Sequence, residues 1–329
     1  GGLALASNTT ASNNTAIGYQ AGYNNTTGVN TFVGAYVGGV NTTGTANTGV
    51  GGEVSGSYTT LRFNSTGSYN SAFGIGALAG NTTASNNTAV GYQAGYSNTT
   101  ASFNTFIGRY SGRTNTTGSQ NTSVGVNSLY LNTTGEYNTA IGKSALVTNT
   151  TGSYNVALGH TALNSNTTAD NNTAVGYKAG YSNTTGSENT GVGHNALYGT
   201  TTGTGNTGIG QGALQNNTTG TTNTAVGQGS LGVNTTASNN SALGKNALGA
   251  NTTGSNNTAV GRQAGDANTT GGSNSIFGDG AYTTGTTGSN NTAIGKSALA
   301  LNTTASNNTA VGYQAAYSNT TGQYNTAVG

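Results

Sequence analysis

Apolar residues recur along this chain at a regular distance, and each of them stands directly before a glycine. Counting that glycine as position 1, a small residue follows at position 4, Leu or Gly usually follows at position 5, and Val, Ile, Leu or Phe closes the unit at position 17. Thr, Val, Ile and Asn fill much of the unit and are poor helix formers. The pattern therefore predicts strands and turns.

The position-1 glycines define the repeat, and two of their nineteen intervals depart from 17 residues. The interval from Gly18 to Gly34 is 16 residues, and the interval from Gly51 to Gly74 is 23. A disordered tract is under no pressure to hold such a register, so we expect a solenoid. The glycines are Gly1, Gly18, Gly34, Gly51, Gly74, Gly91, Gly108, Gly125, Gly142, Gly159, Gly176, Gly193, Gly210, Gly227, Gly244, Gly261, Gly278, Gly295, Gly312 and Gly329.

The expected fold is an all-β, parallel β-solenoid (β-roll) of about nineteen 17-residue rungs, forming one continuous domain over residues 1–329. The irregular rung near residues 51–74 carries a six-residue insertion, which we place around Thr60, Leu61, Arg62 and Phe63. One rung buries apolar area worth roughly 2–4 kcal/mol. Fixing seventeen residues costs more than that, so order must come from stacking.

Each rung is long enough for two short strands and two turns. The segment Asn-Thr-Ala-Val-Gly is the better strand, and Asn-Thr-Thr with its preceding residues is the second. Equivalent strands are expected to pair in parallel with the next rung at about 4.8 Å. The apolar residue at position 17 and the small residues at positions 4 and 5 are expected to form the core.

Two asparagine positions are nearly invariant. Asn occupies position 14 in every unit, as at Asn14, Asn172 and Asn325, and stacked identical side chains can bond to one another as a ladder. Asn also occupies position 8 in most units, with Thr200 and Gly285 as exceptions. Position-8 asparagines begin Asn-Thr-Thr triplets, which are formal N-glycosylation acceptors. Glycans on every rung would crowd, which favours a buried ladder, but glycosylation stays open at sites such as Asn8, Asn81, Asn149 and Asn319.

Composition excludes several function classes. The chain has no Cys, which excludes disulfides and thiolate metal sites and suits an extracellular or surface location. Its net charge of +2 is spread without a Lys/Arg cluster, so we expect no nucleic-acid partner. No apolar stretch approaches about 18 residues, so we expect no membrane insertion by this segment. Because the sequence opens in mid-repeat without Met, we expect it to be part of a longer chain.

Candidate catalytic groups are few. Glu136 and Asp170 share a position two rungs apart, about 9–10 Å if stacked, which approaches the carboxyl separation of an inverting glycosidase. No sugar-stacking Trp accompanies them, so we interpret them as solvated charges. His160 and His194 stand at position 2, which elsewhere holds Arg or Lys, and they lack a third metal ligand. We therefore expect no enzyme activity, no metal and no cofactor.

Tyrosines are paired in four units, at positions 2 and 6, where Gly or Ala replaces Leu at position 5. The rings either pack over the gap left by the missing Leu, which we favour, or form an exposed patch for a host-surface protein or glycan. The four pairs are Tyr19 and Tyr23, Tyr92 and Tyr96, Tyr177 and Tyr181, and Tyr313 and Tyr317.

The segment Asn-Thr-Ala-Ile-Gly-x-x-Ala, as in residues 14–21, 138–145 and 291–298, resembles the head repeat of YadA-like trimeric autotransporter adhesins. In that family the repeats form a left-handed parallel β-roll that trimerises and binds host surfaces. Similar arrays look like repeats in bacterial and phage proteins with tail-fibre-type C-terminal domains. The resemblance implies a homotrimeric, extracellular or virion-surface fibre.

The leading interpretation is a non-enzymatic fibre segment, the shaft or head of an adhesin. One hint independent of the resemblance favours a trimer: neighbouring strand residues point to opposite faces, yet both Ala and Val/Ile of Asn-Thr-Ala-Val-Gly are small or apolar. One face can fill the rung and the other can meet a neighbouring chain. The alternative interpretation is the shaft of a phage or virus tail fibre. A third interpretation is an ice-binding solenoid. The two threonines of Asn-Thr-Thr argue against it, because adjacent residues would point to opposite faces and would not form one flat array.

Overall fold

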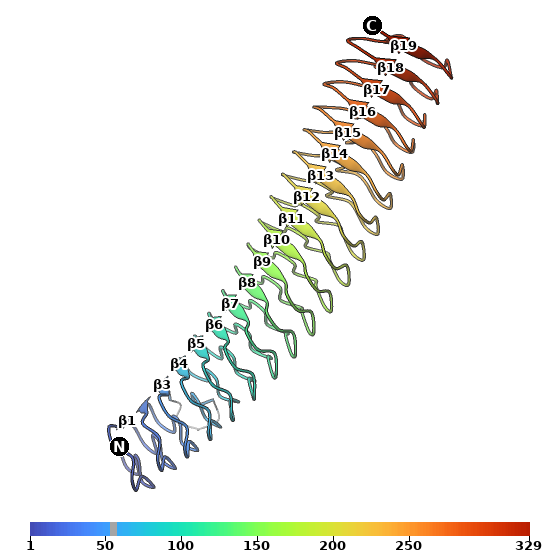
Figure 1. Ribbon diagram of the computed structural model, residues 1–329. Helices are drawn as coiled ribbons and strands as arrows, with labels where there is room; N and C mark the ends of the chain where they lie inside the picture. The colour runs from blue at the N-terminus through green and yellow to red at the C-terminus, as the bar shows by residue number, and fades with distance from the viewer. Residues whose placement is uncertain (53–57) are drawn as a thin grey trace. The chain divides into compact units, whose positions relative to one another are not determined.

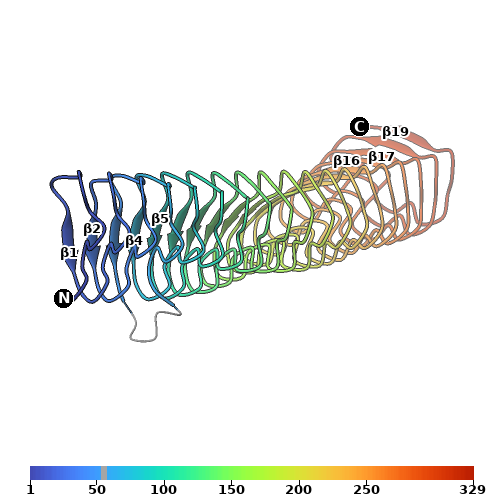
Figure 2. The same ribbon diagram turned by 90° about the horizontal axis from the view of Figure 1, so that it is seen from below.

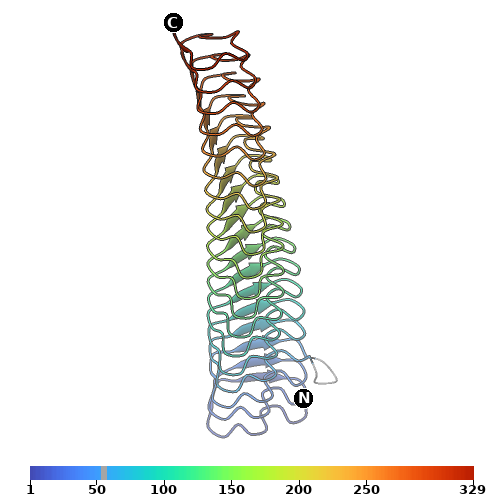
Figure 3. The same cartoon turned by 90° about the vertical axis from the view of Figure 1, so that its right-hand side faces the viewer.

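The computed structural model describes residues 1–52 and 58–329. The chain divides into two compact units, Gly1–Ala169 and Asp170–Gly329. Each unit is all-β, and the regular elements among the described residues are three-residue strands, one to a rung. Within each unit the chain coils repeatedly around a common interior, and successive strands lie side by side (Figures 1, 2 and 3). The prediction of a parallel β-solenoid with 17-residue turns is confirmed.

The strands of the first unit are β1 (Thr15–Ile17), β2 (Thr31–Val33), β3 (Thr48–Val50), β4 (Ser71–Phe73), β5 (Thr88–Val90), β6 (Thr105–Ile107), β7 (Thr122–Val124), β8 (Thr139–Ile141) and β9 (Val156–Leu158). Those of the second unit are β10 (Thr173–Val175), β11 (Thr190–Val192), β12 (Thr207–Ile209), β13 (Thr224–Val226), β14 (Ser241–Leu243), β15 (Thr258–Val260), β16 (Ser275–Phe277), β17 (Thr292–Ile294), β18 (Thr309–Val311) and β19 (Thr326–Val328).

Neighbouring strands pair in parallel and in the register of the sequence repeat. In the pair β8–β9, Thr139 lies opposite Val156 and Ala140 lies opposite Ala157, an offset of one 17-residue unit. The two irregular intervals keep this register, because β1 pairs with β2 and β3 pairs with β4 through the same strand positions. The sequence repeat is therefore the structural repeat.

The long interval adds its extra residues before Thr60, which differs from the expected placement. Thr60 and Leu61 are fully buried, and the backbone N–H of Leu61 donates to the carbonyl of Ala77 at 3.1 Å, as position 5 does in other rungs. Thr60 to Phe63 thus occupy regular positions 4 to 7. Part of the insertion, residues 53–57, lies outside the described residues.

The prediction of a second strand at Asn-Thr-Thr is wrong. Positions 3, 5 and 13 adopt left-handed backbone conformations, as at Ser144 (φ 55°), Leu146 (φ 51°) and Tyr154 (φ 59°). Such residues interrupt an extended chain. The rungs still bond to one another there, since Thr133 N–H donates to the Thr150 carbonyl at 2.9 Å.

The core consists of positions 4, 5 and 16. Ala140, Ala145 and Leu146 are fully buried, and equivalent residues are buried in nearly every rung. The prediction that position 17 belongs to the core is wrong, because Ile141 is 36% exposed and Leu158 is 43% exposed. Side chains alternate along a strand, so the middle residue points inward and its two neighbours point outward.

Candidate functional site

The asparagines at position 8 form a buried ladder. Asn132 is fully buried, and its Nδ2 donates to Asn115 Oδ1 at 2.7 Å and to the Gly135 carbonyl at 2.9 Å. Its own Oδ1 accepts from Asn149 Nδ2 at 2.8 Å. Asn132 therefore bonds within its own rung and to the rungs on both sides, and the same bonds recur at Asn81, which confirms the predicted ladder.

The asparagines at position 14 form a second ladder that uses the backbone. Asn14 Oδ1 accepts from the Asn30 N–H at 2.6 Å, and Asn172 Oδ1 accepts from the Asn189 N–H at 2.9 Å. At the other end, the N–H of Asn325 donates to Asn308 Oδ1 at 2.9 Å. These side chains satisfy backbone donors that lie inside the rung, and their role is structural.

The position-8 ladder limits where a glycan can be attached among the four candidate acceptor asparagines. Asn81 and Asn149 are fully buried, and each Nδ2, the atom that would carry a glycan, already makes two hydrogen bonds of 2.7–2.9 Å. A bulky surface glycan does not fit there. Asn8 and Asn319 lie in terminal rungs and are partly buried, with Nδ2 donating to Ala11 and to Gly322. Glycosylation at these two sites stays a prediction.

Of the two rungs that lack the position-8 asparagine, the one with Gly285 replaces it with a tyrosine from position 5. The Tyr282 ring fills the space beside Gly285, and its hydroxyl donates to the Gly288 carbonyl at 3.1 Å. Asn291 Nδ2 donates to the same hydroxyl at 3.2 Å. Burial raises the pKa of Tyr282 to about 12. The Tyr282 hydroxyl thus replaces the bond to position 11 that a position-8 asparagine makes in other rungs.

We name the surface made by positions 2, 3, 6 and 7 the corner face. The predicted tyrosines lie on it: Tyr19, Tyr92, Tyr177 and Tyr313 at position 2 are 41–67% exposed, and Tyr317 at position 6 is 39% exposed. The remaining three, Tyr23, Tyr96 and Tyr181, are half-buried.

The rings contact rings of the following rung. Tyr19 meets Tyr36 edge-on at 5.3 Å, and Tyr181 stacks on Tyr198 at 5.2 Å. We expected the tyrosine rings to fill the gaps at Gly22 and Gly95. The rings of Phe32 and Phe106 fill them instead. A Cβ on Gly95 would lie 2.6 Å from the Phe106 ring. The tyrosines of these two rungs are therefore not needed to fill the interior.

On the same face, one cation in each unit contacts several tyrosine rings, and these contacts join residues from different rungs. Arg113 lies within 5.5–5.7 Å of the rings of Tyr96, Tyr110 and Tyr130, and its Nε donates to Gln93 Oε1 at 2.8 Å. In the second unit, Lys178 lies 5.3–5.9 Å from three Tyr rings. These distances are those of cation–π contacts.

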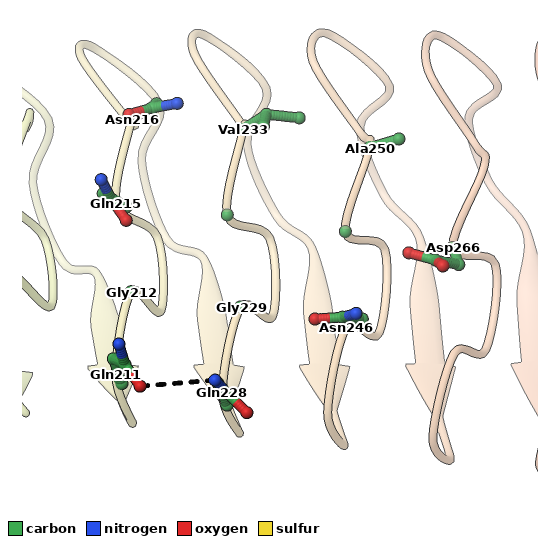
Figure 4. A pocket seen from close by; sticks show the side chains of 12 residues that line it. Gln211, Gly212, Gln215, Asn216, Gln228, Gly229, Val233, Asn246, Ala250 and Asp266 are labelled. Atoms are coloured by element: carbon green, nitrogen blue, oxygen red, sulfur yellow. Dashed lines mark hydrogen bonds between the residues drawn. The ribbon is translucent and has the colours of Figure 1, made fainter.

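The corner face carries a groove in each unit. The groove of the first unit has a volume of about 330 Å³ and includes Gln20, Tyr23, Tyr36 and Arg62. The groove of the second unit is larger, about 560 Å³, and five of the side chains that line it are amides (Figure 4). Both grooves use positions 3, 6 and 7, so the same part of the rung is hollowed twice.

The remaining candidate ionisable residues are spread over both units of the chain. Glu136 belongs to the first unit and Asp170 to the second, while Glu53 lies outside the described residues. His160 and His194 are exposed at position 2, and the His194 ring stacks on Tyr177 at 5.2 Å. Over residues 1–52 and 58–329, no three His, Cys, Asp or Glu side chains come together as metal ligands. Nor does that part of the chain contain a helix capable of crossing a membrane.

The fold and the surface together define a class: a parallel β-solenoid repeat protein with two buried asparagine ladders and a grooved, aromatic corner face. Comparison of the chain with known protein families and with curated proteins finds no match.

Proposed function

We propose that this chain is a segment of a non-enzymatic, homotrimeric surface fibre, the shaft or head of an adhesin, exposed outside the cell or on a virion. The observation that supports it most is the apolar stripe, defined as the position-17 residues of successive strands. Within the second unit, Ile209, Leu243, Phe277 and Ile294 are 39–50% exposed. Continuous apolar surface of this kind marks protein–protein contact sites.

The geometry of the strand supports contact between copies. Thr139 and Ile141 point outward while Ala140 points inward, so each strand offers one polar and one apolar side chain to a neighbour. Identical rungs in identical register give every copy the same repeated surface. In a three-fold oligomer, the same repeated surface of all three copies can meet around the symmetry axis.

The proposal predicts a mass of three chains, each of 32.2 kDa, by sedimentation equilibrium. The double substitution Ile141→Lys with Leu158→Lys places two charges in the stripe, because both residues are exposed on adjacent strands. We expect this variant to dissociate while its far-ultraviolet circular dichroism stays unchanged.

Thr134→Lys is the matched control, since Thr134 is exposed at position 10, away from the stripe, and the variant is expected to remain trimeric. A monomeric wild-type chain would contradict the proposal. The flanking sequence distinguishes an adhesin from a tail fibre. A membrane anchor would indicate an adhesin, and neighbouring virion genes would indicate a tail fibre.

A second candidate, an ice-binding solenoid, is favoured by the same stripe. The outward Thr at position 15 and Val or Ile at position 17 form two parallel columns repeated at the rung spacing, as in β10 and β15. This arrangement differs from the adjacent threonines of Asn-Thr-Thr. A trimer would cover the columns, so a monomer with thermal hysteresis would favour this candidate, and a trimer without it would remove it.

A further inference from the structure

The larger groove crosses four consecutive rungs of the second unit, those that begin at Gly210, Gly227, Gly244 and Gly261. It exists because glycines stand where other rungs carry large side chains. Position 6 is Gly232 and Gly249 here, but Tyr181 and Tyr198 in preceding rungs of the same unit. The missing side chains leave a trough along the corner face (Figure 4).

Amide side chains dominate the walls of this groove. Gln211, Gln215 and Gln228 lie along it, together with Asn216 and Asn246 (Figure 4). Each primary amide offers two N–H donors and a carbonyl acceptor. Sugar hydroxyls both donate and accept, so rows of amides suit them better than they suit an apolar or purely anionic ligand.

The spacing of these amides follows the rungs. Gln211 and Gln228 occupy position 2 in consecutive rungs, and Gln228 Nε2 donates to Gln211 Oε1 at 3.3 Å. Rungs repeat at about 4.8 Å, which is close to the length of one pyranose unit in a linear glycan. A linear chain of sugars can therefore present equivalent hydroxyls to successive rungs.

The charge of the residues that line the groove favours neutral glycans over acidic ones. Asp266 is the one charged residue among those that line the groove in the described structure, and burial raises the pKa of its carboxyl, partly offset by a hydrogen bond from Gln263. A carboxylate without a lining cation disfavours an acidic sugar. Val233 and Ala250 form an apolar edge that can receive the C–H face or an N-acetyl methyl of a sugar.

An aromatic platform continues the same column of residues. Tyr181 and Tyr198 occupy position 6 in the two rungs before Gln215, and their rings stack at 5.2 Å with an interplanar angle of 8°. Aromatic rings supply large apolar contact area with a fixed orientation. The platform therefore extends the surface on which a longer glycan can lie.

We propose that this groove binds a neutral, linear oligosaccharide along the corner face, with its hydroxyls held by the Gln and Asn amides. The inference rests on the proposed role as a surface fibre and names the class of ligand that such a fibre would recognise. The groove uses positions 2, 3, 6 and 7, whereas the apolar stripe uses position 17, so binding and trimer formation do not compete for the same residues.

The test is titration calorimetry of the full 329-residue chain with cellohexaose, maltohexaose, fully N-acetylated chitohexaose and, as an acidic probe, hexagalacturonate. We expect at least one neutral hexamer to bind, and the acidic one to bind at least about tenfold more weakly. Gly232→Tyr fills the middle of the groove with a side chain that position 6 already accepts at Tyr198. It is expected to weaken binding by about tenfold or more.

Val147→Tyr is the matched control, since Val147 holds position 6 in the first unit and lies outside the groove, and it is expected to bind as the wild type does. If Gly232→Tyr disturbs folding, the double substitution Gln215→Ala with Gln228→Ala removes amides without adding bulk and should weaken binding likewise. Failure of all three neutral hexamers to bind, tightest binding of hexagalacturonate, or unchanged binding by a folded groove variant would overturn the inference. A trimer that binds no glycan would overturn this inference alone, whereas a monomer that binds one would overturn the fibre proposal alone.

Discussion

Replacing Gly142 with Ala is expected to lower the free energy of unfolding by roughly 4 kcal/mol. Gly142 has φ +135°, a conformation that residues with a Cβ rarely adopt, and the added Cβ would lie 2.6 Å from the carbonyl carbon of Gly159 in the next rung. The clash is with backbone, so no side chain can move aside. Thermal unfolding followed by circular dichroism should show a melting temperature lower by about 5–10 °C.

Gly152→Ala is the control for this prediction. Its added Cβ also approaches a carbonyl of the next rung, that of Ala169, but Gly152 stands at position 11, where Ala84, Ala101 and Ala169 occur naturally. The fold therefore accommodates Ala at that position, and we expect a change of less than about 1 kcal/mol. Equal effects of the two substitutions would contradict the claim that position 1 requires glycine.

Asn132→Asp is expected to cost about 3–5 kcal/mol at neutral pH. The substitution replaces a donating Nδ2 by an oxygen that faces two acceptors, Asn115 Oδ1 and the Gly135 carbonyl, at a fully buried position. Burial and the facing oxygens both disfavour the ionised form, so the pKa of the new carboxyl is raised in the folded state.

The pH dependence follows from that direction. A carboxyl whose pKa is higher in the folded state than its unfolded value of about 3.9 destabilises the fold increasingly as pH rises above that value. The deficit of Asn132→Asp relative to the wild type should therefore be larger at neutral pH than near pH 4. Asn86→Asp is the control, because Asn86 is exposed with a φ of 60° that Asp also tolerates, and it should differ little from the wild type at either pH. A deficit for Asn132→Asp that does not grow with pH would contradict the ladder's hydrogen-bond pattern.

Much of the fold could be predicted from the sequence because identical residues recur at identical positions. The 17-residue register and the stacking of Asn132 on its counterparts follow from repetition alone. The second strand was mispredicted because Leu146 and Tyr154 adopt left-handed conformations that their residue types do not signal. Position 17 was wrongly assigned to the core because a strand of three residues is too short for its alternation of polar and apolar residues to reveal which one points inward.

The surface was less predictable than the interior. The tyrosines of the corner face were found because they repeat, but the grooves arise from missing side chains, such as that of Gly232, and glycine is common everywhere in this chain. The Phe106 ring fills the interior space that the glycines at position 5, Gly95 and Gly112, leave open. Comparing the units could have revealed this compensation. The replacement of a ladder asparagine by Tyr282 left two sequence signals, the missing Asn at Gly285 and a Tyr in place of the usual Leu or Gly at position 5.

The central claim is that one 17-residue unit is one rung, bonded to its neighbours by repeated contacts. Thermal unfolding of two deletions tests it most directly: residues 126–142, which removes one whole unit and joins Gly125 to Lys143, and residues 126–133, which removes about half of one. Because stability in a solenoid is close to a sum over rungs and their interfaces, the whole-unit deletion should keep the wild-type circular dichroism and nearly its melting temperature. The shorter deletion should lower the melting temperature sharply, since it removes Asn132 from its ladder and leaves a rung too short to keep the 17-residue register. A whole-unit deletion that is as damaging as the shorter one would contradict the account.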